Sequence, residues 1–325
     1  MPIDGMDTYV AWGEEDVAFG TAAGEDEVVR MESESLSYSK PILFSPSLGE
    51  TTKRAPRSGL RGVSGDTVHV MEFEGFGPIL KHALGACSTA ALTNGYAHTF
   101  THAAALFNSI TVHVGKGGVK DIYTGCRVTQ VEFKYEAGKP LMVTFTYVGV
   151  AGSTGAATAS PVFPTAEEVV ETMGAVTMGA QGAAADVAVD VKSAVVRYKA
   201  PFNENIYPCT DVVRAALPRS DKVEVSGELV MWWDDMTEYT LFTAATLCEL
   251  NLTHTGSLIG GTDYYKFQIQ VGAFKFTPTG DSNVGGADVL ERALPFEGYV
   301  DDATDVDPYQ PIELLLQNGV AAIAF

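Results

Sequence analysis

Two histidines four residues apart are the first candidates for chemistry in this sequence. His98 and His102 lie in the stretch "YAHTFTH", and histidines at this spacing can bind one metal ion when they share a face of a helix. The surrounding residues are more typical of an extended or irregular chain than of a helix. The sequence therefore predicts ordinary structural histidines at both positions and no metal site.

Three further patterns match functional motifs only in part. Residues 114–121, "VGKGGVKD", contain Gly and Lys but lack the spacing of a phosphate-binding loop. Residues 301–307, "DDATDVD", lack the Gly and the distal Glu of an EF-hand loop. No GxSxG nucleophile motif occurs either. We therefore expect no enzyme, no cofactor, and no catalytic or metal-binding residues.

The four cysteines are far apart in the sequence, at Cys87, Cys126, Cys209 and Cys248. They show none of the CxxC spacing that is typical of metal or redox sites. We expect reduced cysteines that are mostly buried and behave as small apolar side chains.

The charge of the chain is strongly acidic. It has 41 acidic and 21 basic residues, for a net charge of −20, and residues 163–325 carry −15 of it. Such a surface repels phosphate groups, which disfavours tight binding to nucleic acid or to an anionic membrane. No apolar run approaches the roughly 20 residues of a membrane span, so we expect no membrane insertion.

Alternating polar and apolar residues predict a mainly β protein. In residues 131–149, "VEFKYEAGKPLMVTFTYVG", Val131, Phe133 and Tyr135 share one face, and the turn falls at residues 137–140. Residues 109–125 predict a second hairpin with its turn at residues 115–118. These two hairpins are the clearest local signals in the chain.

Two short amphipathic helices are also expected. The first includes Pro78 in its first turn, has Gly85 near its end, and is expected to end at Cys87. The second begins with a capping-box pattern at Asp235 and is expected to end at Cys248.

One order of motifs occurs twice in the chain. "VSGD" begins at Val63 and "VSGE" begins at Val225, and each precedes an apolar stretch and then an expected helix. The matching pairs are Gly65 and Gly227, Cys87 and Cys248, His102 and His254, and Phe133 and Phe274. Their separation falls from 162 to 141 residues along the chain, as loop insertions and deletions after a duplication would produce. We therefore interpret the chain as a tandem repeat, in which Gly65 and Gly227 form a bulge or turn.

The repeat suggests four segments. Residues 1–28 are expected to form an N-terminal arm, residues 29–155 a first β unit, and residues 156–185 a small-residue linker or extra hairpin. Residues 186–325 are expected to form a second β unit with a C-terminal arm.

The order of these motifs resembles the tail tube, or major tail, proteins of long-tailed bacteriophages. The resemblance rests on the early "GEEDVAFGT", on "GDTVHVMEFEGFGPILKHALG", on the two hairpins, and on the closing "PFEGYVDDATDVDPYQPIELLLQNG". It implies a β-sandwich or half-barrel unit with a short flanking helix and extended terminal arms. In this chain it implies two such units in tandem.

The resemblance also implies which residues contact other subunits. The loop at residues 45–62 and its counterpart at residues 203–222 would stack one ring on the next. Their basic residues are the candidate stacking residues: Lys53, Arg54, Arg57, Arg61, Arg214 and Arg219. Many members of the family carry one unit and form rings of six, so a chain with two units predicts a homotrimeric ring with pseudo-sixfold symmetry.

An acidic inner wall would let DNA pass without adhering to it. The candidate lumen-facing acids, chosen from the polar faces of expected strands, are Glu72, Glu74, Glu132 and Glu136. The resemblance further implies assembly in the host cytoplasm, a place in the virion tail, and contacts with tape measure, terminator and distal tail proteins. Two alternatives remain: a secretion-system or bacteriocin tube protein, and a monomeric β-sandwich that binds a ligand such as carbohydrate.

Overall fold

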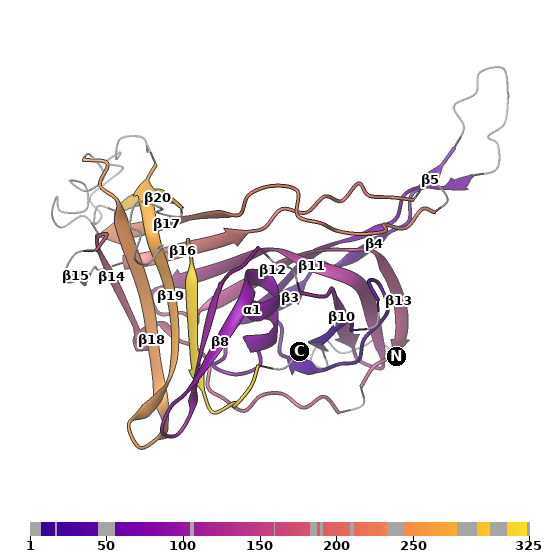
Figure 1. The fold of residues 1–325 in the computed structure, drawn as a ribbon. Helices are drawn as coiled ribbons and strands as arrows, with labels where there is room; N and C mark the ends of the chain where they lie inside the picture. Colours follow the sequence, from indigo (N-terminus) through magenta and orange to yellow (C-terminus); the bar gives the residue numbers. More distant parts are fainter. Residues whose placement is uncertain are drawn as a thin grey trace.

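The protein is a mainly antiparallel β structure with a single α-helix in the part described (Figure 1). The computed structural model describes residues 8–16, 18–44, 56–104, 107–158, 160–182, 187–188, 191–208, 211–232, 244–277, 291–299 and 311–323. Within these ranges, nineteen strands join in one sheet, and two short strands form a separate ribbon.

The elements of the first half of the chain are β1 (Thr8–Glu14), β2 (Glu27–Val29), β3 (Ser33–Glu34), β4 (Ser37–Ser39), β5 (Ile42–Leu43), β6 (Arg57–Ser58), β7 (Gly62–Val70), α1 (Gly77–Leu84), β8 (Gly85–Ala91), β9 (Tyr96–His102), β10 (Ile110–Lys116), β11 (Val119–Glu136), β12 (Met142–Gly149) and β13 (Ala151–Ala156). Those of the second half are the short 3-10 helix η1 (Glu171–Met173), β14 (Gly174–Ala180), β15 (Val187–Ala188), β16 (Val191–Lys199), β17 (Glu224–Trp232), β18 (Cys248–Gly260), β19 (Asp263–Phe276), β20 (Glu291–Gly298) and β21 (Glu313–Asn318).

The long strand β11 connects two layers of the sheet. Its first part, Val119–Thr124, pairs with β10 and β13, while its second part pairs with β12 and β16. β1 adds to the outer side of β10, and β7 adds to β12. Both predicted hairpins are confirmed, because β10–β11 and β11–β12 turn where the alternating pattern stops.

The main core lies between these two layers. Trp12 of β1 is fully buried and packs against Phe145 of β12 and Phe76, with ring centroids 5.9 and 6.0 Å apart. Along β12, buried and half-buried residues alternate up to Tyr147, as expected of a strand that buries one face, and the sequence shows the same alternation. The helix α1 covers this core with Ile79 and Leu80, both fully buried.

Strand pairing also links the two halves of the chain. The second part of β11 pairs with β16, and β21 lies between β9 of the first half and β19 of the second. β16 continues through β17 and β20 to β19. The halves thus share one continuous sheet.

The helix predictions are correct in part. The first helix is confirmed, with Pro78 in its first turn, but it ends at Leu84 because Gly85 adopts a left-handed conformation and its N–H caps Lys81 O. Cys87 is therefore in β8, and the expected end was wrong. Of the second expected helix, residues 235–243 lie outside the described residues; Cys248 begins β18 rather than ending a helix.

The terminal segments are more firmly packed than the sequence suggested. Thr8–Glu14 was expected in an arm, but it forms β1, whose five central residues are all buried. Near the other end, Ile323 packs partly against the main core and closely approaches Gly77 at the start of α1. The five central residues of β1 are therefore covered within the protomer, whereas Val320 near the other end stays 39% exposed.

Candidate assembly surfaces

A two-stranded ribbon formed by β5 and β6 projects from the body of the protein (Figure 1). Arg57 lies on β6 and is exposed, while Arg61 lies at the base of the ribbon and is half-buried. Lys53 and Arg54 lie outside the described residues. The ribbon therefore positions part of the predicted stacking loop away from the main sheet.

The loop at residues 203–222 runs beside the base of this ribbon. The N–H of Arg61 donates to Val212 O at 2.8 Å, and the Tyr207 hydroxyl donates to Arg61 O at 3.1 Å. The structure thus places Arg61, at the end of the loop at residues 45–62, against the loop that the repeat predicted to be its counterpart.

Arg214 and Arg219 make their contacts inside the protomer. The Arg214 guanidinium is nearly buried, and it donates to Glu204 Oε2 and to Gly149 O, both at 2.7 Å. Arg219 donates to Ala103 O at 2.8 Å. Both side chains hold the loop at residues 203–222 in place.

The candidate lumen-facing acids fall into two groups. Glu132 and Glu136 lie on the face of β11 that points away from the core, where Glu132 pairs with Arg197 at 2.5 Å. Glu136 pairs with Lys139 at 2.6 Å, and the hydrogen bond from Lys139 lowers the pKa of Glu136 below its usual value. This face therefore carries paired charges rather than a uniform acidic layer.

Glu72 and Glu74 follow β7 instead of lying on it. Glu72 is only 4% exposed, not on an exposed polar face as the sequence suggested, and its carboxylate accepts a hydrogen bond from Arg30 at 3.0 Å. Burial raises the pKa of Glu72, despite the opposing effect of Arg30. Glu74 lines a surface groove at the start of α1.

That groove has a volume of about 850 Å³ and is lined by both acidic and apolar side chains. Five carboxylates line it: Asp16, Glu25, Asp26, Glu27 and Glu74. Burial, followed by the negative charge of Glu74, raises the pKa of Glu27 to about 7. The sequence analysis did not identify this groove, because its wall comes from four segments that are distant in the chain.

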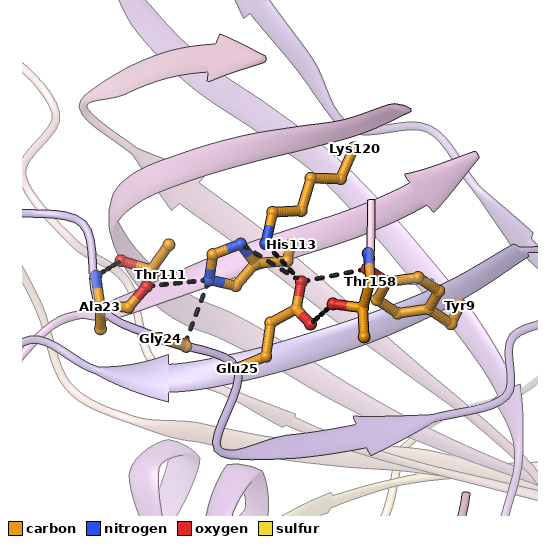
Figure 2. A network of polar contacts seen from close by, with 8 residues as sticks. All are labelled: Tyr9, Ala23, Gly24, Glu25, Thr111, His113, Lys120 and Thr158. Carbon is orange, nitrogen blue, oxygen red and sulfur yellow. Dashed lines mark hydrogen bonds and ion pairs between the residues drawn. The ribbon is translucent and has the colours of Figure 1, made fainter. Parts of the chain in front are cut away.

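A polar network beside the groove fastens the segment after β1 to the sheet (Figure 2). The Glu25 carboxylate accepts hydrogen bonds from Lys120, at 2.7 Å, from Tyr9, at 3.0 Å, and from Thr158. Burial alone would raise the pKa of Glu25, but these hydrogen bonds bring it below its usual value. His113 Nε2 lies 3.0 Å from Ala23 O and ties the same segment to β10.

A second carboxylate, Glu15, is buried and fully engaged. It accepts hydrogen bonds from Gly125 N at 2.7 Å, Gly20 N at 2.8 Å, Thr111 Oγ1 at 2.9 Å and Ser109 Oγ at 2.5 Å. Buried charges are stable only with such a set of donors. Neither network exposes a reactive group.

The histidines and cysteines show structural roles. His98 contacts Thr89 Oγ1 at 2.9 Å and Val320 O at 2.9 Å, and His102 contacts the Tyr198 hydroxyl at 3.0 Å.

The described cysteines, Cys87, Cys126 and Cys248, are free thiols, and Cys209 lies outside the described residues. Within the described residues, no group of three His, Cys, Asp or Glu side chains could hold a metal ion.

These features define a class of structural protein. It is built on a large antiparallel sheet with a projecting ribbon, and many of its buried polar side chains bind other parts of the same chain. None of the helices in the described ranges is long and apolar enough to cross a membrane. A family model described as phage tail tube protein matches residues 5–299, and the chain belongs to that family. Comparison with curated proteins gave no significant match.

Membership in this family defines the function. The protein is a structural component of the phage virion tail, where it polymerises into the tail tube, and it is not an enzyme.

Proposed function

We propose that each protomer contributes two tandem tube units, residues 29–155 and 186–325, so that three protomers close one ring of the tail tube. The linker 156–185 joins these units, and the terminal segments, residues 1–28 and the C-terminal end, extend their contacts to neighbouring subunits. The observation that carries the proposal is a match in strand register between the halves.

The two "VSG" strands have the same neighbours on both sides. In the first half, Val63 of β7 is opposite Tyr38 of β4 and Gly149 of β12. In the second half, Val225 of β17 is opposite Tyr198 of β16 and Gly298 of β20. The same tyrosine, valine and glycine are aligned across three strands in each half, and this supports a duplication over a similarity of composition alone.

The loops that follow the two tyrosines also begin alike. Pro41 O accepts a hydrogen bond from Gly59 N at 2.8 Å, and Pro201 O accepts one from Ser220 N at 3.0 Å. Each pair closes the base of one of the loops expected to stack. This match supports a duplication of the whole unit rather than of a single motif.

Ring closure requires contacts between open strand edges. Among the described strands, β8 pairs only with β9, and β13 only with β11. Both carry small residues that leave their edges accessible. Pairing between protomers would cover such edges, and a contact between different surfaces closes into a ring when its rotation allows.

We further propose that the outward face of β11, with Glu132 and Glu136, lines the lumen through which DNA passes. Its acids repel phosphate, and its ion pairs moderate that repulsion. Tape measure, terminator and distal tail proteins are the expected partners at the ends of the tube. The basic loop residues, with Arg57 and Arg61 the ones best placed on the ribbon, would contact the next ring.

Electron microscopy of tubes assembled from the purified protein tests this proposal. We expect rings of three chains that show threefold symmetry and an approximate sixfold repeat of density around an open channel. Rings of six chains would overturn the trimer while leaving the tube intact. Single compact particles at high protein concentration would contradict assembly by this chain on its own.

A further inference from the structure

The β5–β6 ribbon and the residues next to it expose several large apolar side chains. Ile42, Leu43 and Leu60 are each more than half exposed, at 63%, 57% and 55%, and Phe44 is 49% exposed. Among the described strands, the ribbon forms a two-stranded sheet of its own. Isolated two-stranded ribbons are marginally stable, and clustered exposed apolar residues mark contact surfaces.

The ribbon also carries the opposite charge to the rest of the chain. Residues 40–61 contain five basic residues and one acidic residue, a net charge of +4 in a chain of −20. Of these, Lys40, Arg57 and Arg61 are described, and none of them forms an ion pair within the described residues. The ribbon therefore combines apolar side chains with unneutralised positive charge.

The groove at the start of α1 has the complementary composition. Besides its five carboxylates, it is lined by apolar side chains that include Val162, which is 84% exposed, together with Phe163 and Ile323. The cations beside it are already engaged, because Arg30 binds Glu72 and Lys120 binds Glu25. An arriving cation would relieve the repulsion between Glu27 and Glu74.

We propose that the β5–β6 ribbon of one protomer docks in the groove of a second copy of this chain, with its apolar residues against Val162 and Phe163 and its basic residues against the groove carboxylates. The ribbon projects away from the body (Figure 1), and the groove is a different surface at the start of α1. A contact between two different surfaces repeats from copy to copy, which suits the stacking of rings. This inference rests on the proposed stacking role of the ribbon and adds the surface that receives it.

Charge reversal on each side of the contact tests the proposal. Arg57→Glu changes the ribbon, and Glu27→Lys changes the groove. Because breaking a close interfacial charge pair is costly, we expect each variant to raise the protein concentration needed for tube formation by about tenfold or more. The double variant restores complementary charges and should return this concentration to within about threefold of the unmodified protein.

Matched controls carry the same changes elsewhere on the surface. Lys275→Glu and Glu297→Lys alter exposed residues of β19 and β20, outside the ribbon and the groove, and should leave tube formation unchanged. Glu27→Gln separates folding from docking. It removes a carboxylate that Glu74 repels, so the protomer should fold at least as well as the unmodified protein. Because it also removes a charge from the groove, it should still weaken tube formation. Circular dichroism of each variant verifies that the protomer is folded.

The outcomes separate this inference from the proposed function. If the unmodified protein forms no tubes, the proposed function fails. If it forms tubes and folded Arg57→Glu and Glu27→Lys variants assemble as it does, the docking contact is wrong and the tube stands. If both variants fail and the double variant is not rescued, the ribbon and the groove do not contact each other.

Discussion

At the scale of single residues, a chain of buried polar groups holds the two layers of the core together. Trp12 Nε1 donates to the Tyr147 hydroxyl at 3.1 Å, and that hydroxyl lies 3.2 Å from Thr67 Oγ1. Thr67 in turn contacts His69 Nε2 at 2.8 Å. Every member is buried, so the network depends on each group keeping its partner.

Tyr147→Phe should destabilise the protein by about 1 to 3 kcal/mol, because it leaves the Trp12 N–H buried without an acceptor. Urea unfolding followed by tryptophan fluorescence measures the loss. Tyr264→Phe, which removes a hydroxyl from a side chain 48% exposed, serves as the control and should change the free energy of unfolding little. Equal effects in both variants would show that the network does not contribute.

Glu27→Gln should stabilise the protein above pH 7 and have no effect near pH 4. The folded pKa of about 7 exceeds the unfolded one, so the wild-type carboxyl is protonated in both states at low pH. As the pH rises from about 4.5 to 7, the folded state loses stability, and the loss is complete above pH 7.

The gain in the Glu27→Gln variant should reach about 1 to 2 kcal/mol at pH 8, allowing for solvent screening of a half-buried group. Thermal or urea unfolding at pH 4 and pH 8 gives the difference. Glu228→Gln, which changes an exposed carboxyl on β17, is the matched control. A gain that is the same at both pH values would rule out the carboxylate repulsion.

Individual pairings of this kind could not be predicted from the sequence. Alternation showed which face of β11 is apolar, and it correctly placed Glu132 and Glu136 on the other face. It could not show that Arg197, 65 residues further on, neutralises Glu132, nor that Glu72 is buried. Those facts depend on which strands pair, and pairing is set by the whole sheet.

At the scale of elements, the repeated "VSG" motif requires glycine because neighbouring strands approach it closely. Gly65 has φ of 143°, and a Cβ there would lie 2.5 Å from Ser35 O. A Cβ on Gly227 would lie 2.2 Å from Val195 O. Both are structural, as expected. Gly227 lies within a regularly paired stretch of β17 rather than at a bulge or turn, whereas Gly65 is paired with β12 on one side and faces the break between β3 and β4 on the other.

Gly65→Ala and Gly227→Ala should each destabilise the protein by more than about 2 kcal/mol, since backbone oxygens cannot move aside without disrupting strand pairing. Gly118→Ala is the control, because no atom lies within 4 Å of its Cβ position. Thermal unfolding of the three variants provides the comparison. A stable Gly227→Ala variant with unchanged melting would refute the close approach.

Local elements were predicted well where their signals are short-range. The two hairpins and the start of α1 depend on turns, alternation and a proline within a few residues. β1 and β21 were missed, because their partners lie far away in the chain: β1 pairs with β10, and β21 with β9 and β19. The small, acidic residues around β1 resemble a flexible arm until β10 provides a partner.

At the scale of the whole molecule, the two proposed units share strand pairing and hydrogen bonds. The linker itself contributes to the first half, since Val169 N donates to Met71 O and Leu141 N donates to Val169 O, both at 2.8 Å. β21, which belongs to the second half, pairs with β9 of the first half. Contacts of this kind favour one cooperative unit over two domains that unfold separately.

The protomer should therefore unfold in a single transition, with calorimetric and van't Hoff enthalpies in agreement, below the concentration at which it assembles. Cutting the chain between residues 160 and 161 sharpens the test, because the first fragment loses β16 and β21 while the second loses β9 and β11. Each fragment alone should show little native β structure, and mixing them should restore the circular dichroism of the intact chain. Two resolved transitions, or fragments that fold separately, would indicate that the two proposed units are autonomous and that the shared sheet is a contact between two domains.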